Sequence, residues 1–116
     1  MVRRIVVGAH YGLKDWLVQR ITALVMALYT LLWLGIALVH EGIDYALLRA
    51  LFANGAFRAC TALFFLALLW HAWVGTREIW MDYVKPTALR LTIEALTALI
   101  LLGYAMWMID LLWGRP

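Results

Sequence analysis

The sequence predicts an all-α integral membrane protein with three transmembrane helices, and three observations support that prediction. The chain of 116 residues is 66% hydrophobic and only 15% charged, whereas a soluble domain carries about a quarter of charged residues. Its apolar residues gather in three windows, each long enough for the roughly 17–25 residues that a spanning helix needs. The length allows one domain, residues 1–116. Because lipid offers the backbone no hydrogen-bond partners, we expect each window to be a helix.

The first predicted span covers residues 21–39 and contains no charged residue. The second covers residues 59–80 and is uncharged up to Gly75. The third covers residues 91–112, and Glu94 is its one charged residue before Asp110. Arg90 precedes Glu94 by four positions, a spacing that allows the two side chains to pair on one helix face.

The connections between the spans also carry signals. Residues 44–52 have an amphipathic pattern, which predicts a short helix at the membrane interface. The Asn54-Gly55 pair is typical of a turn and should end that helix. Pro86 should close the second long helix, because the residue before a proline tends to leave the helical conformation.

The basic residues predict the orientation of the chain. Seven of them lie before the first span or between Arg77 and Arg90, around the end of the second span, on one side of the membrane, and three lie on the other side. Cytoplasmic loops carry the excess of lysine and arginine, so we expect the N-terminus in the cytoplasm and the C-terminus on the opposite side of the membrane. Because these residues flank spans, the net charge of +3 indicates orientation, and no nucleic-acid partner is expected.

His71 is the candidate functional residue inside a span. It lies nine residues from the cytoplasmic end of the second span, roughly 14 Å deep in a core of about 30 Å. Ionisable groups at that depth are rare and often functional. His71 is therefore either a metal or cofactor ligand or a side chain that hydrogen-bonds to a neighbouring helix.

Two small residues lie on the same helix face as His71, namely Ala67 and Gly75. They could leave a flat recess for a haem, or they could serve close helix packing. His71 is the only histidine deep in a span, since His10 precedes the first span and His40 follows it. A second haem ligand would have to come from another subunit or another copy of the chain.

Asp82 and Tyr83 follow His71 at the cytoplasmic end of the second span. Asp82 is eleven residues from His71, which in a continuous helix is nearly the same face, roughly 16 Å away. A tyrosine hydroxyl can donate a hydrogen bond to a quinone carbonyl, and a carboxylate can relay protons. The alternatives are an interfacial anchor for Tyr83 and an ion pair of Asp82 with Lys85 or Arg77.

The segment HAWVGTREIWMDYVKP, residues 71–86, resembles the most recognisable segment of the small hydrophobic membrane-anchor subunit, the D subunit, of bacterial succinate dehydrogenase. The likeness extends to GLKDWLVQRITALV near the N-terminus and to ALRLTIEAL at the start of the third span. It therefore covers nearly the whole chain. The His-Ala-Trp-x-Gly and Asp-Tyr-x-Lys-Pro elements at this separation are its most specific part.

The resemblance implies a non-catalytic anchor of succinate:quinone oxidoreductase, complex II, whose partners are a flavoprotein, an iron–sulfur subunit and a second cytochrome b anchor, the C subunit. In this family the C and D subunits share one haem b, and His71 stands where the D-subunit iron ligand stands. Tyr83 and Asp82 match the family's ubiquinone site. Arg20 matches a basic residue near the haem propionates. Lys14 replaces a histidine of some relatives and can also meet a propionate.

Three other functions remain open at this point. An anchor of a quinol:fumarate reductase would have the same residue types, because they do not determine whether the complex oxidises succinate or reduces fumarate. A small multidrug transporter needs an acid inside the membrane and usually four spans, and Glu94 is the only candidate acid. A haemless structural anchor would use His71 for packing alone.

Overall fold

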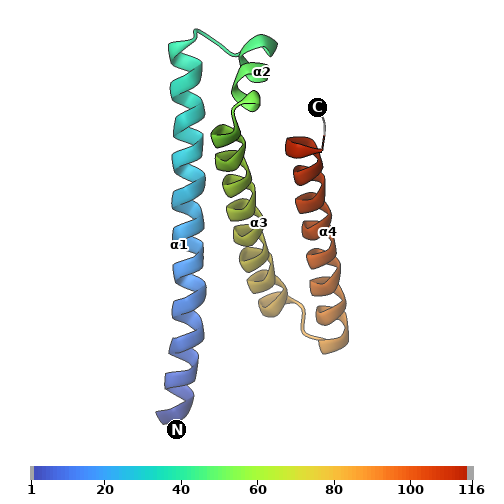
Figure 1. Cartoon of the computed structure of the whole chain (residues 1–116). Helices are drawn as coiled ribbons and strands as arrows, with labels where there is room; N and C mark the ends of the chain where they lie inside the picture. Colours follow the sequence, from blue (N-terminus) through green and yellow to red (C-terminus); the bar gives the residue numbers. More distant parts are fainter. Residues whose placement is uncertain (1, 115–116) are drawn as a thin grey trace.

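The computed structural model describes the backbone of residues 2–114 and the side chains of residues 12–114. Over this range the regular structure is helical throughout: α1 (Val2–Val39), α2 (Tyr45–Ala53), α3 (Gly55–Tyr83) and α4 (Thr87–Trp113). Figure 1 shows three long helices with α3 between α1 and α4. The N-terminus and the α3–α4 connection lie at one end of the bundle, and α2 and the C-terminus lie at the other.

Within the described residues, three segments are long and apolar enough to cross a membrane: Gly12–Val39 of α1, α3 and α4. This confirms the predicted all-α fold class with three spanning helices. Each helix runs past the predicted span within it, and the membrane limits at 21–39, 59–80 and 91–112 stay predictions. The largest difference is at α1, which begins at Val2. A drop in hydrophobicity marks where a helix leaves the lipid, but it does not end the helix. The basic N-terminal part of α1 contains no proline that would interrupt it, so the helix continues there.

The short connections follow the predicted turn chemistry. Asp44 caps α2 by accepting a hydrogen bond from the Leu47 backbone N–H at 2.9 Å. Asn54 ends α2 and also caps α3, because its Oδ1 accepts from the backbone N–H of Ala56 at 2.8 Å. An asparagine at such a position satisfies N–H groups that have no partner within the helix. The predicted short helix at 44–52 is confirmed as α2, displaced by one residue.

Polar residues of α1 face α3 at intervals of seven. Asp15, Thr22 and Tyr29 are spaced by close to two turns each, so they share one face of α1. The Tyr29 hydroxyl lies 2.6 Å from Thr61 Oγ1 of α3, and the Tyr29 ring stacks on Phe64 with centroids 4.6 Å apart. We call Asp15, Thr22 and Tyr29 the polar stripe of α1. It fixes how α1 is placed along α3.

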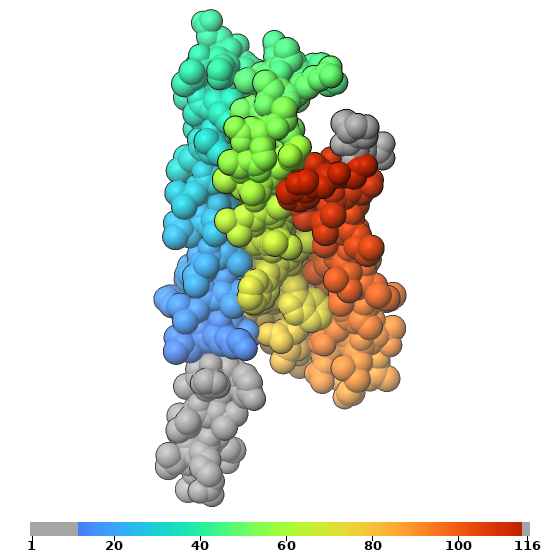
Figure 2. Space-filling model, viewed as in Figure 1, coloured from blue at the N-terminus to red at the C-terminus, as the bar shows by residue number. Residues whose placement is uncertain are grey.

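Few side chains are enclosed by the chain itself. Among the described residues, the buried apolar ones are Ala67, Val74 and Met108, and the buried polar ones are Thr22 and Thr61. The space-filling view in Figure 2 shows the three long helices side by side, with α3 in contact with both neighbours. Most leucines point outward. Such a surface suits lipid or other membrane subunits, and not water.

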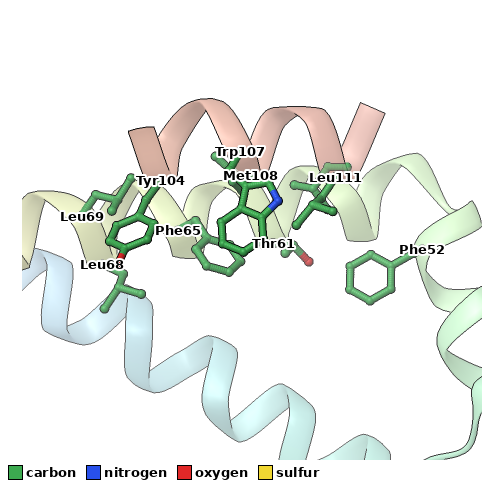
Figure 3. A pocket seen from close by; sticks show the side chains of 10 residues that line it. Phe52, Thr61, Phe65, Leu68, Leu69, Tyr104, Trp107, Met108 and Leu111 are labelled. Carbon is green, nitrogen blue, oxygen red and sulfur yellow. The ribbon is translucent and has the colours of Figure 1, made fainter. Parts of the chain in front are cut away.

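The contact of α3 with α4 differs between its two ends. Near the α3–α4 connection, the Trp80 indole N–H donates to Thr97 Oγ1 at 3.1 Å. Toward α2, a cavity of about 490 Å³ opens between the helices. Figure 3 shows Phe65, Tyr104 and Trp107 along it, and its lining is almost wholly apolar. This cavity lies at the opposite end of α3 from Asp82 and Tyr83.

Candidate functional site

His71 lies in the middle of α3 and contacts α1 through one ring nitrogen. Its ring is partly buried, and its Nδ1 lies 3.0 Å from Thr22 Oγ1. Thr22 is only 5% exposed. The hydrogen bond to a neighbouring helix, one of the two predicted readings, is therefore present. It leaves Nε2 without a hydrogen bond to any described residue. In metal-binding histidines, the ring nitrogen that does not bind the metal almost always forms a hydrogen bond, as Nδ1 does here.

At Gly75, one side of the possible recess beside His71 is occupied by α1. Ala67 is 8% exposed, and a Cβ added at Gly75 would lie 3.6 Å from the side-chain nitrogen of Gln19. Small residues allow helix backbones to approach closely in membranes. Gly75 thus serves close packing against α1, which was the alternative to a flat haem recess, and Ala67 is buried.

Gln19 brings an unpaired polar atom close to this contact. Its Oε1 is buried and has no hydrogen-bond partner among the described residues. Gln19 lies one turn from Thr22 on α1, beside Gly75 on α3. A buried acceptor without a donor costs about 1–3 kcal/mol. A donor from water, a bound group or another subunit would remove that cost, so the region around His71 is chemically incomplete in the isolated chain.

Asp82 and Tyr83 are the last two residues of α3. Because α3 continues without a break from His71 to Tyr83, Asp82 lies within about 20° of the face that carries His71. Tyr83 is 78% exposed, and Asp82 is exposed as well. Neither side chain forms a hydrogen bond or ion pair with a described residue. Asp82 does not pair with Lys85 or Arg77, so both groups are available to a ligand or another subunit.

Arg77 pairs across the helices instead. Its Nη2 lies 2.9 Å from Asp15 Oδ2, and the two side chains are 33% and 31% exposed. This ion pair ties α1 to α3 about one and a half turns from Asp82, at the end near the α3–α4 connection. The ion pair that spacing allowed within the third span, between Arg90 and Glu94, is not formed in the described part of the chain.

A double-mutant cycle should detect the Asp15–Arg77 pair. We expect Asp15→Asn and Arg77→Gln each to lower the thermal stability of the protein in detergent. The coupling energy should be about 0.5–1 kcal/mol, since partly exposed ion pairs are screened. Melting of the two single variants and the double variant measures it. Strictly additive effects of the two substitutions would mean that the pair contributes nothing.

Lys14 and Arg20 form no hydrogen bond with His71 in the described part of the chain. Both are exposed on α1, and the Arg20 guanidinium lies over the Trp16 ring, 5.2 Å from its centroid. Arg20 precedes Thr22 by two residues, so it starts from a face of α1 about 200° away from Thr22. Their contact with haem propionates stays a prediction.

Sequence reasoning missed Thr22 and the Asp15–Arg77 pair. The signal that could have found them is the seven-residue spacing of the polar stripe, which runs from the basic segment into an otherwise apolar span. Polar side chains at such positions on a membrane helix usually face another helix. The spacing gives the face on α1, but it does not say which residues of α3 lie opposite.

Fold and site together define a small three-span helical membrane subunit, with a histidine inside one span and an Asp-Tyr pair at the end of the same helix. The model of the family described as succinate dehydrogenase/fumarate reductase transmembrane subunit matches residues 2–111, and the chain belongs to this family. It is 42% identical over 102 residues to the succinate dehydrogenase hydrophobic membrane anchor subunit of Coxiella burnetii (strain RSA 493 / Nine Mile phase I), covering 88% of this chain and 89% of that relative.

These comparisons confirm the resemblance found in residues 71–86. The chain is a multi-pass membrane protein and a transmembrane subunit of the succinate dehydrogenase/fumarate reductase family. Family membership, together with three spanning helices, removes the small multidrug transporter from the open functions.

Proposed function

We propose that this chain is the D-type anchor subunit of a succinate:quinone oxidoreductase in a bacterial inner membrane. It holds the flavoprotein and iron–sulfur subunits on the cytoplasmic side, where its N-terminus lies, and its C-terminus is periplasmic. It packs against a second anchor, the C subunit. On its own it is not an enzyme, because succinate is oxidised in the flavoprotein. Family membership and the three apolar helices support this assignment.

The residues around His71 fit one half of a shared haem b site. His71 offers Nε2 as an iron ligand while Nδ1 is held by Thr22, and the unpaired Gln19 Oε1 indicates that another group completes this region. When bound, haem b supplies a one-electron redox centre within the membrane. His40 lies beyond the far end of α1, so a second histidine for the haem would come from the C subunit.

Arg20 and Lys14 are proposed to pair with the haem propionates. Both are exposed cations on the N-terminal part of α1, and Arg20 lies only two residues, about 3 Å of helix rise, from Thr22. The Arg20 guanidinium rests on Trp16 by a cation–π contact, an interaction that leaves its N–H groups able to donate to a carboxylate.

Tyr83 and Asp82 are proposed to form one wall of the ubiquinone site. The Tyr83 hydroxyl donates a hydrogen bond to a quinone carbonyl oxygen, which stabilises the negative charge that builds on that oxygen during reduction. Two electrons arrive from the iron–sulfur subunit, and two protons from the cytoplasmic side complete the quinol. Asp82, exposed at the helix end, passes such protons on from water. The iron–sulfur and C subunits close the rest of the pocket.

One observation carries this proposal. A single unbroken helix, α3, holds His71 at its middle and Asp82 and Tyr83 at its end, on nearly one face. The test is to purify the chain in mild detergent together with everything bound to it. We expect three partner subunits, one flavin and a b-type absorption spectrum. A preparation of the chain without a flavoprotein would contradict the proposal.

Two alternatives are separated by further measurements. An anchor of a quinol:fumarate reductase is covered by the same family description, and the rates of succinate oxidation with quinone and of fumarate reduction with quinol distinguish it. A haemless anchor would give a flavin and three partners without a b-type spectrum.

A further inference from the structure

We propose that Thr22 is a positioning residue that fixes the tautomer of His71, so that Nε2 carries the free electron pair. This inference rests on the proposed role of His71 as a haem ligand. A neutral imidazole has one N–H, and only the nitrogen without hydrogen can bind a metal. The residue that decides where this hydrogen sits therefore decides whether Nε2 can be a ligand.

The neighbours of Thr22 Oγ1 determine which group donates. The oxygen lies 2.7 Å from the Val18 carbonyl oxygen, 3.2 Å from the Gln19 carbonyl oxygen and 3.0 Å from His71 Nδ1. A hydroxyl has one hydrogen, and the Val18 carbonyl, the closest of the three, can only accept it. With that hydrogen committed, Oγ1 must accept the third contact. Nδ1–H is then the donor, and Nε2 is left unprotonated.

The two hydrogen bonds act in series. Nδ1–H donates to Oγ1, and the Thr22 hydroxyl donates to the Val18 carbonyl. Bonds linked in this way polarise one another in a medium of low dielectric. Thr22 is 5% exposed, so water competes little for its oxygen. Electron density is thereby shifted toward Nε2, which makes it a better electron donor to a metal.

The polar stripe holds Thr22 at the level of His71. On one side of Thr22, Asp15 pairs with Arg77 at 2.9 Å. On the other side, the Tyr29 hydroxyl lies 2.6 Å from Thr61 Oγ1. These contacts flank the Thr22–His71 bond at intervals of seven residues along α1, so a slide of α1 along α3 would break all three. Thr22 also has a β-branched side chain with few χ1 choices in a helix.

The test uses Thr22→Val in the intact complex, since valine keeps the shape of threonine and lacks the hydroxyl. We expect haem affinity to fall about 10–100-fold, the usual effect of losing such a partner of a metal-binding histidine. The haem that remains should have a higher midpoint potential, because a ligand that donates less electron density stabilises ferric iron less. Its low-spin ferric electron paramagnetic resonance spectrum should also shift. Thr22→Ser should behave like the natural protein.

Thr30 provides a matched control on the same helix. Its hydroxyl donates to the Met26 carbonyl at 2.8 Å, and Thr30 is exposed with no histidine beside it. Thr30→Val therefore removes the same kind of intrahelical bond and should leave the haem spectrum and potential unchanged. If Thr30→Val shifted them as much as Thr22→Val did, the effect would belong to α1 in general, and the proposal would be wrong.

The outcomes separate this inference from the proposed function. An unchanged potential and spectrum in Thr22→Val would overturn the role of Thr22 and leave His71 as a ligand. A normal haem spectrum in His71→Ala would overturn the proposed haem site itself. Should Thr22→Val fail to assemble, Thr22→Ala and Thr22→Ser decide, because they differ mainly by the hydroxyl. An altered potential in the alanine variant alone supports the proposal, and equal potentials in the two refute it.

Discussion

His71→Ala is expected to remove the b-type haem signal from the purified complex. Alanine has no atom that can bind iron, and His71 is the only histidine in the middle of a long helix among the described residues. Loss of the hydrogen-bond partner of a metal-binding histidine already lowers the affinity for the metal about 10–100-fold. Loss of the histidine itself should therefore leave less than about a tenth of the haem bound. The measurement is the reduced-minus-oxidised absorption spectrum per flavin.

His40→Ala is the control for this experiment. His40 follows α1 at the end near α2, is exposed, and should leave the spectrum unchanged. Succinate oxidation with a water-soluble acceptor reports that the flavoprotein is still attached in both variants. A full haem signal in an assembled His71→Ala complex would exclude His71 as the iron ligand.

Tyr83→Phe should strongly impair quinone reduction while the complex still assembles. The substitution removes only the hydroxyl of a side chain that is 78% exposed and has no hydrogen bond within the described chain, so the fold loses no contact. A positioned donor or acid typically contributes about 10²–10⁴-fold to a rate, and we expect kcat/KM for ubiquinone to fall by roughly 10²-fold. Steady-state rates with a short-chain ubiquinone measure it.

Tyr104→Phe is the matched control for Tyr83. Tyr104 is 53% exposed on α4 and lines the apolar cavity toward the opposite end of the bundle. Its hydroxyl should be irrelevant to quinone reduction. Succinate oxidation with a water-soluble acceptor should be normal in both variants, and undiminished quinone kinetics in Tyr83→Phe would rule out the donor role.

The sequence predicted the helices well because their signals are local. Uncharged runs place α3 and α4, and Asp44 and Asn54 mark the ends of α2 through hydrogen bonds to residues two or three positions away. The start of α1 was not predicted. A helix satisfies its own backbone inside and outside lipid, so a change in hydrophobicity at residue 21 does not end it.

The site was predictable only along one helix. His71, Asp82 and Tyr83 are all on α3, where helical periodicity relates them without knowledge of other elements. Contacts between helices depend on how far one is shifted along the other, which no local pattern gives. For this reason Thr22 was missed as the partner of His71, and the sequence left open whether Gly75 lines a haem recess or packs against a helix, where the structure places Gln19.

The sparse interior of this chain has a consequence for how it must be made. Only Ala67, Val74 and Met108 are buried apolar side chains among the described residues, so little tertiary packing opposes separation of the three helices after insertion. A newly synthesised copy that meets no companion subunit should therefore have a short lifetime against membrane proteases, which act on loosened chains. Cells that produce it in excess of its companions should clear the surplus and keep anchor levels matched to assembled complexes.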